Sequence, residues 1–311
     1  MSEFILHHYP ASPFSEKVRL LMAYKKQACR SVIIPVIMPK PGLMPLTGGY
    51  RKTPVAQIGA DIYCDTAIIC RLIDRMFPDN SIYPAEFEAS LGAMAHWTDT
   101  FFFMVSVGMV FQPEVMQNHE LFSDPEVAAA FVADRAELRK GSKDAPMEPG
   151  VVKPYWLMHM KRLDEQLANH SFMFGDQPSI VDFSTYHCCW FVYNNEVLRD
   201  GFKPFENVLA WRERMSAFGE GDLIEMSALD ALEVAKNVEP VTQPKIAAMG
   251  SDGLASGDTV EIMPIDYGLQ PTSGELLVAS LEELALLRED PQVGKVAVHF
   301  PRLGFQVNKI A

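Results

Sequence analysis

Hydrophobic and polar positions divide the first part of the chain, residues 4–84, into short runs typical of strands and longer periodic runs typical of helices. In chain order we expect a strand over 4–9, a helix over 13–26, a strand over 31–37, an irregular loop over 38–50, strands over 55–58 and 62–64, and a helix over 66–76. The turn residues Gly59-Ala60-Asp61 favour a hairpin between the last two strands. This order predicts a small mixed sheet with helices on both faces.

The pattern changes twice further along the chain. From residue 85 to about 237 the strand signals disappear and long helical patterns follow, which predicts an all-helical second domain. Beyond Pro240, short strand-like runs return, and about 60 residues form only a thin core alone. We therefore expect three parts: an α/β domain over 1–84, an all-α domain over 85–239, and a small β-rich appendage over 240–311 that leans on the helical domain.

Two local patterns stand out in the helical part. Ser179-Ile180-Val181-Asp182 has the form of a capping box and predicts a helix start rather than a catalytic site. Trp97, Phe101 and Val105 recur at a spacing of four, which gives one apolar helical face. Core packing is the favoured interpretation of that face, and the wall of a substrate pocket is the alternative.

Charge and composition limit the classes of molecule that this protein is expected to bind. The 311 residues carry 27 basic and 40 acidic side chains, a formal net charge of −13, which disfavours nucleic acid and anionic membranes. The start of the chain has no secretory signal pattern, and the five cysteines include the neighbours Cys188 and Cys189, so we expect a soluble cytoplasmic protein. No ligand spacing predicts a metal site, because His7-His8 and His187-Cys188-Cys189 are adjacent residues.

Three short motifs fall at element ends on one side of the predicted sheet. They are Tyr9-Pro10-Ala11-Ser12-Pro13-Phe14-Ser15, Lys52-Thr53-Pro54-Val55 and Asp65-Thr66. With these motifs in this order, residues 4–84 resemble the thioredoxin-like half of a cytosolic glutathione transferase, and residues 85–237 resemble its helical half. Residues beyond 240 have no counterpart in the usual two-domain family.

The resemblance assigns glutathione to the second and third motifs. Pro54 is expected after a cis peptide bond, with the backbone of Thr53 pairing to the tripeptide as an added strand would. Asp65 would accept from the γ-glutamyl ammonium, while Thr66 and the nearby helix amides would hold the carboxylate. Lys52 matches a family lysine near the ligand. The alternatives are a turn proline, a helix cap by Asp65 and a solvated surface lysine.

The first motif lies where relatives carry Cys-x-x-Cys, and its serines exclude a mixed disulfide. Ser12 is the preferred donor to the glutathione thiolate, Tyr9 and Ser15 are the other candidates, and Phe14 is expected beside the ligand. A hydrogen bond to a charged group contributes about 1.5 to 3 kcal/mol, enough to lower a thiol pKa from about 8.5 by one to two units. A simple N-cap role for Ser12 is the alternative.

These inferences favour a glutathione-dependent transferase in which the ionised thiol attacks a small hydrophobic electrophile. A glutathione-dependent isomerase or dehalogenase is a second hypothesis, and a non-catalytic interaction module is a third, which the added β unit favours. The resemblance also implies a homodimer, in which Asp99 of one subunit reaches the ligand of the other.

Overall fold

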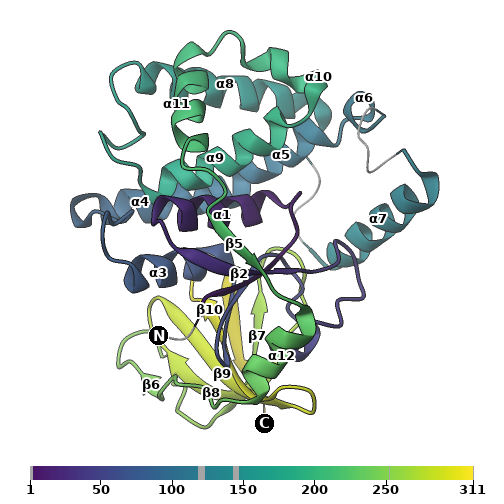
Figure 1. The fold of residues 1–311 in the computed structure, drawn as a ribbon, viewed down its shortest axis with the longest axis vertical. Coiled ribbons are helices and arrows are strands. Elements are labelled where there is room, and N and C mark those ends of the chain that lie inside the picture. Colours follow the sequence, from purple (N-terminus) through teal and green to yellow (C-terminus); the bar gives the residue numbers. More distant parts are fainter. Residues whose placement is uncertain (1–2, 118–122, 143–146, 252, 311) are drawn as a thin grey trace.

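The computed structural model describes residues 3–117, 123–142, 147–251 and 253–310. Its first part follows the predicted order closely (Figure 1). The elements are β1 (Ile5–His8), α1 (Pro13–Tyr24), β2 (Ala28–Ile33), α2 (Met44–Thr47), β3 (Val55–Ile58), β4 (Asp61–Cys64) and α3 (Thr66–Met76). Strand β1 pairs in parallel with β2 and antiparallel with β3, and β3 and β4 form the expected hairpin.

Apart from shifts of one or two residues at element ends, two segments of this part differ from the expectation. The second strand covers Ala28–Ile33 rather than 31–37, because Pro35 lacks the amide that would continue the ladder. The loop expected over 38–50 contains one short helix, α2, whose last turn ends at Gly48 in the left-handed region, with φ 69°. Both differences lie in or beside a segment rich in proline and glycine, where the sequence pattern of regular structure is weak.

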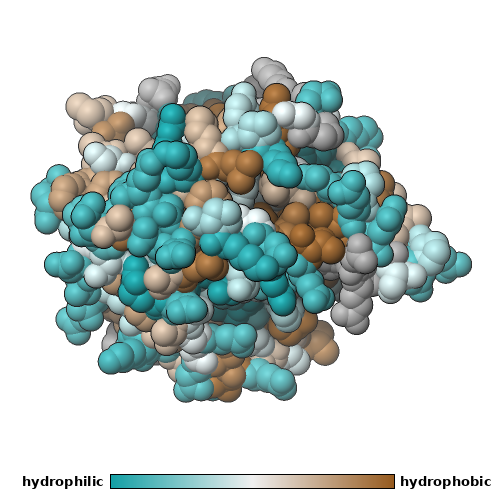
Figure 2. All heavy atoms as spheres, turned by 90° about the horizontal axis from the view of Figure 1, so that it is seen from above, coloured by the Kyte–Doolittle hydropathy of each residue, from teal (hydrophilic) through white to brown (hydrophobic). Residues whose placement is uncertain are grey.

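The middle of the chain is mainly helical. It contains a 3-10 turn (Ala85–Phe87), α4 (Glu88–Trp97), a π-helical turn (Thr98–Phe102), α5 (Phe103–Val110), α6 (Pro113–Met116), α7 (Pro125–Leu138), α8 (Pro149–Leu167), α9 (Ile180–Tyr193), α10 (Glu196–Arg199), a second 3-10 turn (Asp200–Phe202) and α11 (Glu206–Ser216). Helix α9 packs against α1 and so joins the helical part to the sheet. In Figure 2, which views the helical end, hydrophobic residues form separate patches among hydrophilic ones.

The predicted capping box is confirmed at the start of α9. The Asp182 carboxylate accepts from the Ser179 amide and hydroxyl, each at 2.9 Å. It also accepts from the Met173 amide and the Trp211 indole, both at 2.9 Å. Because the carboxylate is fully buried, these four donors offset the cost of removing its charge from water. Asp182 therefore fixes α9 against α11 and the preceding loop.

The aromatic face around residue 100 departs from the expected core role. The π-helical turn inserts one residue into the helical repeat, so the four-residue spacing no longer keeps one face. Phe102 and Val105 are buried, whereas Trp97 and Phe101 are 38% and 40% exposed. The prediction of core packing is correct for Val105 and wrong for Trp97 and Phe101.

We expected the last part of the chain to pack mainly on the helical domain, and this prediction is wrong. Its strands are β6 (Lys245–Ile246), β7 (Thr259–Pro264), β8 (Thr272–Ala279), β9 (Glu283–Asp290), β10 (Gly294–Pro301) and β11 (Phe305–Lys309). Strand β10 pairs in parallel with β4, with Val298 opposite Ile62, so the extension continues the first sheet. Among the described residues the sheet order is β11-β7-β8-β9-β10-β4-β3-β1-β2-β5, and β6 pairs with β8. The lower half of Figure 1 shows these strands together.

The segment just before the extension also belongs with this sheet. Strand β5 (Asp222–Glu225) pairs with β2, although it falls in the range predicted to be helical. Helix α12 (Ala228–Lys236) packs with the extension in one hydrophobic cluster. That cluster includes Leu46 and Ile62 of the first part and Val298 and Phe300 of the extension. A shared core of this kind explains how a thin β unit is stabilised.

A buried polar group marks the junction between β4 and β10. The His299 ring stacks on Tyr63 at a centroid distance of 4.3 Å, and its nitrogens lie 2.7 Å from Glu283 Oε1 and 3.3 Å from Asp61 Oδ1. Burial alone would lower the pKa of His299, but the hydrogen bonds to Asp61 and Glu283 outweigh it and raise that pKa. Both apolar packing and electrostatic interactions therefore stabilise the junction between β4 and β10.

Candidate functional site

A cavity of about 1300 Å³ lies where the α/β part, the helical part and the C-terminal extension meet. It contains eight of the nine residues predicted to form the site: Tyr9, Ser12, Phe14, Lys52, Thr53, Pro54, Asp65 and Thr66. The ninth, Ser15, does not line it. Its hydroxyl is buried and has no hydrogen-bond partner among the described residues. The fold thus brings together three motifs that lie at residues 9–15, 52–55 and 65–66 of the sequence.

Ser12 caps α1 and lines the cavity. Its side chain is nearly buried, and Oγ accepts a hydrogen bond from the Ser15 amide at 3.2 Å. A hydroxyl that accepts one hydrogen bond still has its proton to donate. The two interpretations of Ser12, helix cap and donor to a ligand, are therefore compatible. Pro13 at the first helical position fixes the backbone so that the N-terminus of α1 faces the same cavity.

Tyr9, at the end of the first strand, is the second hydroxyl in the cavity. Burial raises the pKa of Tyr9. Arg135 and Ser12 lower this pKa, but their effect is smaller than that of burial. The phenol is therefore protonated at neutral pH and can donate a hydrogen bond. Lys40 Nζ lies 5.7 Å from the centre of the Tyr9 ring.

The Thr53–Pro54 peptide bond is cis, as predicted from the resemblance. A second cis bond, Met38–Pro39, was not predicted. Within the described part of the chain, no hydrogen bond involves the Thr53 amide or carbonyl, while its hydroxyl accepts from Lys40 Nζ at 3.0 Å. Because Thr53 and Pro54 both line the cavity, an extended peptide can reach this backbone.

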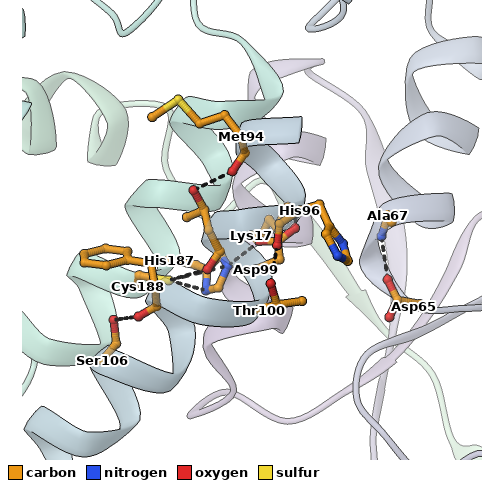
Figure 3. A network of polar contacts seen from close by, with 12 residues as sticks. Lys17, Asp65, Ala67, Met94, His96, Asp99, Thr100, Ser106, His187 and Cys188 are labelled. Atoms are coloured by element: carbon orange, nitrogen blue, oxygen red, sulfur yellow. Dashed lines mark hydrogen bonds and ion pairs between the residues drawn. The ribbon is translucent and has the colours of Figure 1, made fainter. Parts of the chain in front are cut away.

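Asp65 joins β4 to α3 and has an unusual backbone conformation, with φ 88°. Positive φ in a residue other than glycine is uncommon and often occurs at functional sites. Its Oδ1 accepts from the Ala67 amide at 2.8 Å, so the predicted alternative of a helix cap is also present (Figure 3). Burial raises the pKa of Asp65, and the carboxylates of Asp99 and Asp266 raise it further. A bound cation beside Asp65 would relieve this repulsion.

Lys52 contacts the C-terminal extension, which the sequence did not predict. Its Nζ lies 2.7 and 2.9 Å from the two carboxylate oxygens of Asp266 and 3.9 Å from the centre of the Tyr267 ring. The segment 265–267 therefore forms one wall of the cavity beside the γ-glutamyl site expected from the resemblance. Lys52 is mostly buried, so the alternative of a solvated surface lysine does not describe it.

A cationic cluster that also lines the cavity was missed. Arg51 pairs with Asp134 at 2.8 Å, and Arg135 lies 3.5 Å from the same carboxylate. Lys40 is 3% exposed and donates to the Arg51 carbonyl at 3.2 Å. Burial, together with the neighbouring charges of Arg135 and Arg51, lowers the pKa of Lys40 to about 8. The only sequence signal was the three basic residues between 40 and 52, within a loop rich in proline and glycine.

A polar network under the site involves Asp99 of the π-helical turn (Figure 3). Its carboxylate lies 2.6 Å from Lys17 Nζ and 3.0 Å from His187 Nε2. Burial raises the pKa of Asp99, but Lys17 and His187 outweigh it and lower the pKa to about 2. The Phe14 ring packs on His187 at 4.6 Å. Asp99 therefore forms two polar contacts within its own chain and also lines the cavity, while its expected contact with a partner's ligand stays a prediction.

The remaining wall is apolar. Phe14 contacts Phe103 at a centroid distance of 4.6 Å, and Phe111 stacks on Phe131 at 6.0 Å. Met104 and Val107 of α5 complete this surface. Such a wall can hold a hydrophobic ligand next to the hydroxyl of Ser12.

Within the described ranges, no group of three or more His, Cys, Asp or Glu residues is arranged to hold a metal ion. The same residues include no helix long and apolar enough to cross a bilayer. All five cysteines are free and buried. Burial raises the pKa of Cys29 to about 11 and of Cys189 to about 12, so neither is a ready nucleophile.

Comparison with known proteins supports one family. Residues 6–81 match the N-terminal domain of glutathione S-transferase, and residues 155–214 match its C-terminal domain. A GST-like protein from Pseudomonas syringae is similar over 100% of both chains, with 40% identity and a TM-score of 0.84. A search of the curated proteins gives no match.

More distant structures share the fold. A glutathione S-transferase from Rhodospirillum rubrum F11 is 16% identical, with a TM-score of 0.51 over 69% of this chain and 88% of its own. Poplar glutathione transferase F1 is 15% identical, with a TM-score of 0.51 over 76% of this chain and 100% of its own. The site geometry, the two matched domains and the full-length relative agree. The chain belongs to the glutathione S-transferase family.

Proposed function

We propose that this protein is a glutathione transferase in which the Ser12 hydroxyl stabilises the thiolate of bound glutathione for attack on a hydrophobic electrophile. The observation that carries the proposal is the placement of Ser12, Thr53-Pro54 and Asp65 around one open cavity. The extension lines this cavity without filling it, which favours a catalytic protein over a non-catalytic interaction module.

Each end of glutathione has a suitable partner. The γ-glutamyl ammonium would pair with Asp65, and its carboxylate would accept from Thr66 and the first amides of α3. The cysteinyl unit would pair with the backbone of Thr53, as an added strand does. Lys40, which has no carboxylate partner among the described residues, would bind the glycyl carboxylate.

The chemical step requires little more than an ionised thiol held beside the acceptor. The thiol proton leaves to solvent, and the Ser12 hydroxyl donates a hydrogen bond to the sulfur anion. The N-terminus of α1 adds about 0.3 to 1 kcal/mol in the same direction. The sulfur then forms a bond to the electrophilic carbon, and the leaving group departs with its electron pair.

Ser12→Ala tests the assignment. Loss of a hydrogen bond worth about 1.5 to 3 kcal/mol predicts a roughly 10- to 150-fold fall in conjugation of glutathione to chlorodinitrobenzene. The dissociation constant for glutathione, measured by calorimetry, should change far less. Full activity in Ser12→Ala together with loss in Tyr9→Phe would assign the role to Tyr9. No heat with wild-type protein at millimolar glutathione would favour the non-catalytic module.

We also propose a cytoplasmic homodimer, as is usual for the family. The exposed rings of Trp97 and Phe101, with Tyr155 beside Phe101, offer an apolar surface on the helical part that a second copy can cover. Light scattering of the purified protein measures its mass directly, and a monomer at micromolar concentration would contradict the proposal.

A further inference from the structure

We propose that the electrophile accepted by this cavity is an anionic aromatic compound whose carboxylate, or a similar group, is bound by Arg139 with Arg135. This inference rests on the proposed glutathione chemistry and specifies its second substrate. It comes from two features that meet in one place: an aromatic wall, and Arg139, which has no carboxylate partner among the described residues.

The arginines come from the C-terminal end of α7, which lies apart from the other helices in Figure 1. Arg135 and Arg139 are four residues apart, so they lie on the same side of this helical segment, and both line the cavity. The side chain of Asp134 ties this end of the helix to Arg51 and to the Met38 amide, at 2.8 and 3.0 Å. The arginines are therefore attached to the glutathione side of the cavity.

Arg139 has only weak partners in the described part of the chain. Its Nη2 lies 3.4 Å from the Met104 sulfur, and its guanidinium carbon lies 5.8 Å from the centre of the Tyr267 ring. A thioether sulfur is a weak acceptor, whereas a guanidinium binds carboxylates through two parallel hydrogen bonds. These contacts hold Arg139 between α5 and the extension and leave its charge available to a ligand.

Arg139 differs from the neighbouring arginines in its contacts. Arg51 and Arg135 both lie beside the Asp134 carboxylate, and Lys52 is paired with Asp266. Arg139 and Lys40 have no carboxylate partner among the described residues, and the proposed function assigns Lys40 to the glycyl carboxylate of glutathione. Arg139 is therefore available to an anionic group on the acceptor.

The aromatic part of the acceptor follows from the wall next to Arg139. Met104 adjoins Phe103, whose ring contacts Phe14 two residues after Ser12. Arg135 itself packs over the Phe131 ring at 4.7 Å, and Phe131 stacks on Phe111. A flat ring bound among these side chains would place its reactive carbon toward Ser12 and its anionic group toward Arg139.

The test uses two acceptors that share the same ring and leaving group: a chlorodinitrobenzoate, which carries a negative charge, and its uncharged methyl ester. In both, the glutathione thiolate forms a bond to the ring carbon that bears chlorine, and chloride leaves with its electron pair. For each acceptor, kcat/KM is divided by the rate constant of the uncatalysed reaction, which removes the difference in intrinsic reactivity. We expect this corrected ratio to favour the benzoate by about tenfold or more in the wild-type protein.

Arg139→Met should bring the ratio close to one, and Arg139→Lys should retain part of the preference. Lys161→Met, which removes an exposed cation on α8, serves as the matched control and should keep the wild-type ratio. A purely structural role for Arg139 would slow both acceptors and leave the ratio unchanged, and that result would overturn the proposal. A wild-type ratio of one or less would overturn it as well.

A binding measurement separates this inference from the proposed function. Dinitrobenzoate, which lacks a leaving group, is titrated into the protein without glutathione and compared with uncharged dinitrobenzene. Tighter binding of the anion, lost in Arg139→Met, supports the anionic site even if no glutathione binds. If the protein binds glutathione and turns over the ester but binds dinitrobenzoate no more tightly than dinitrobenzene, the anionic site is overturned and the proposed function is not.

Discussion

Asp65 shows how one side chain can serve both the fold and the site. Its carboxylate caps α3 through the Ala67 amide, while its φ of 88° turns the residue toward the cavity. Ser12 does the same for α1. Because the first residues of both helices line the cavity, capping residues are placed where a helix dipole would stabilise a bound anion or thiolate. Cap and ligand contact are therefore not competing interpretations at these positions.

The change Asp65→Asn separates the two roles of this residue. Asparagine caps helices about as well as aspartate, so the free energy of unfolding should change little. The negative charge facing the glutathione ammonium is lost, and such a hydrogen bond contributes about 1.5 to 3 kcal/mol. We expect the dissociation constant for glutathione to rise about tenfold or more in calorimetry. An unchanged constant would show that Asp65 is only a cap.

Asp99 is expected to stabilise the fold. Asp99→Asn keeps the shape but leaves Lys17, whose side chain is 1% exposed, without its carboxylate. Breaking a buried pair in this way costs about 3 to 5 kcal/mol, and the 15% exposure of Asp99 favours the lower end. Urea unfolding measures the loss. A change below about 1 kcal/mol would mean that water replaces the carboxylate, and Lys17→Met with Asp99→Leu should restore part of the stability.

Among the elements, the pairing of β10 with β4 joins the C-terminal extension to the first sheet. Val298 lies opposite Ile62, and the strand covers an edge that would otherwise expose unpaired amides and carbonyls. The extension also carries the segment 265–267 to the cavity, where it holds Lys52. One β unit therefore protects the sheet edge and shapes the site.

His299, at this junction, predicts a pH dependence. Its pKa is raised above the unfolded value of 6.5, so its contribution to stability is complete below that pH and is lost as pH rises through the folded pKa. Asp61 and Glu283 have lowered pKa values, because hydrogen bonds outweigh burial, and they lose their contributions as pH falls below the unfolded values of 3.8 and 4.5. The three groups together stabilise the junction most between about pH 4.5 and 6.5.

The corresponding experiment compares wild-type protein with His299→Gln in urea unfolding across pH. The difference in the free energy of unfolding should be largest near pH 6 and should shrink as pH rises above 6.5. His170→Gln, at an exposed position on the helical part, is the matched control and should show no such trend. A difference that stays constant with pH would mean that the histidine contributes through packing on Tyr63 rather than through its charge.

The π-helical turn explains why one element-level prediction was partly wrong. The sequence around Trp97 has a regular four-residue repeat, and the residue types there do not predict the extra residue of the π-helical turn. Tertiary contacts determine it, because the turn lets Asp99 reach both Lys17 and His187. A sequence pattern reports the face that a regular helix would bury, and it fails where packing interrupts the repeat.

At the scale of the whole molecule, the site was largely predictable because its motifs are short and local. Ser12 at a helix start and Asp65 at a strand end each follow from a few adjacent residues, and the cis bond before Pro54 follows from the family resemblance that these short motifs carry. The place of the extension was not predictable, because Val298 and Ile62 are far apart in sequence. Alternating hydrophobicity shows that a strand has a buried face and does not show which strand it joins.

The cavity itself belongs to this scale, since three parts of the chain contribute its walls. The α/β part supplies the hydroxyls and the peptide backbone, the helical part supplies the aromatic wall and Arg139, and the extension supplies Asp266 and Tyr267. Long-range packing of these three parts therefore determines the shape of the cavity, while local motifs supply the residues proposed to bind glutathione.

The central claim is that the cavity ionises the thiol of bound glutathione. The most direct measurement is the ultraviolet absorbance of the thiolate in the complex, titrated across pH and compared with free glutathione. We expect the bound thiol to have a pKa about one to two units below its free value, and Ser12→Ala to remove most of that shift. Saturable binding with a thiol that titrates at the same pH as free glutathione would contradict the account.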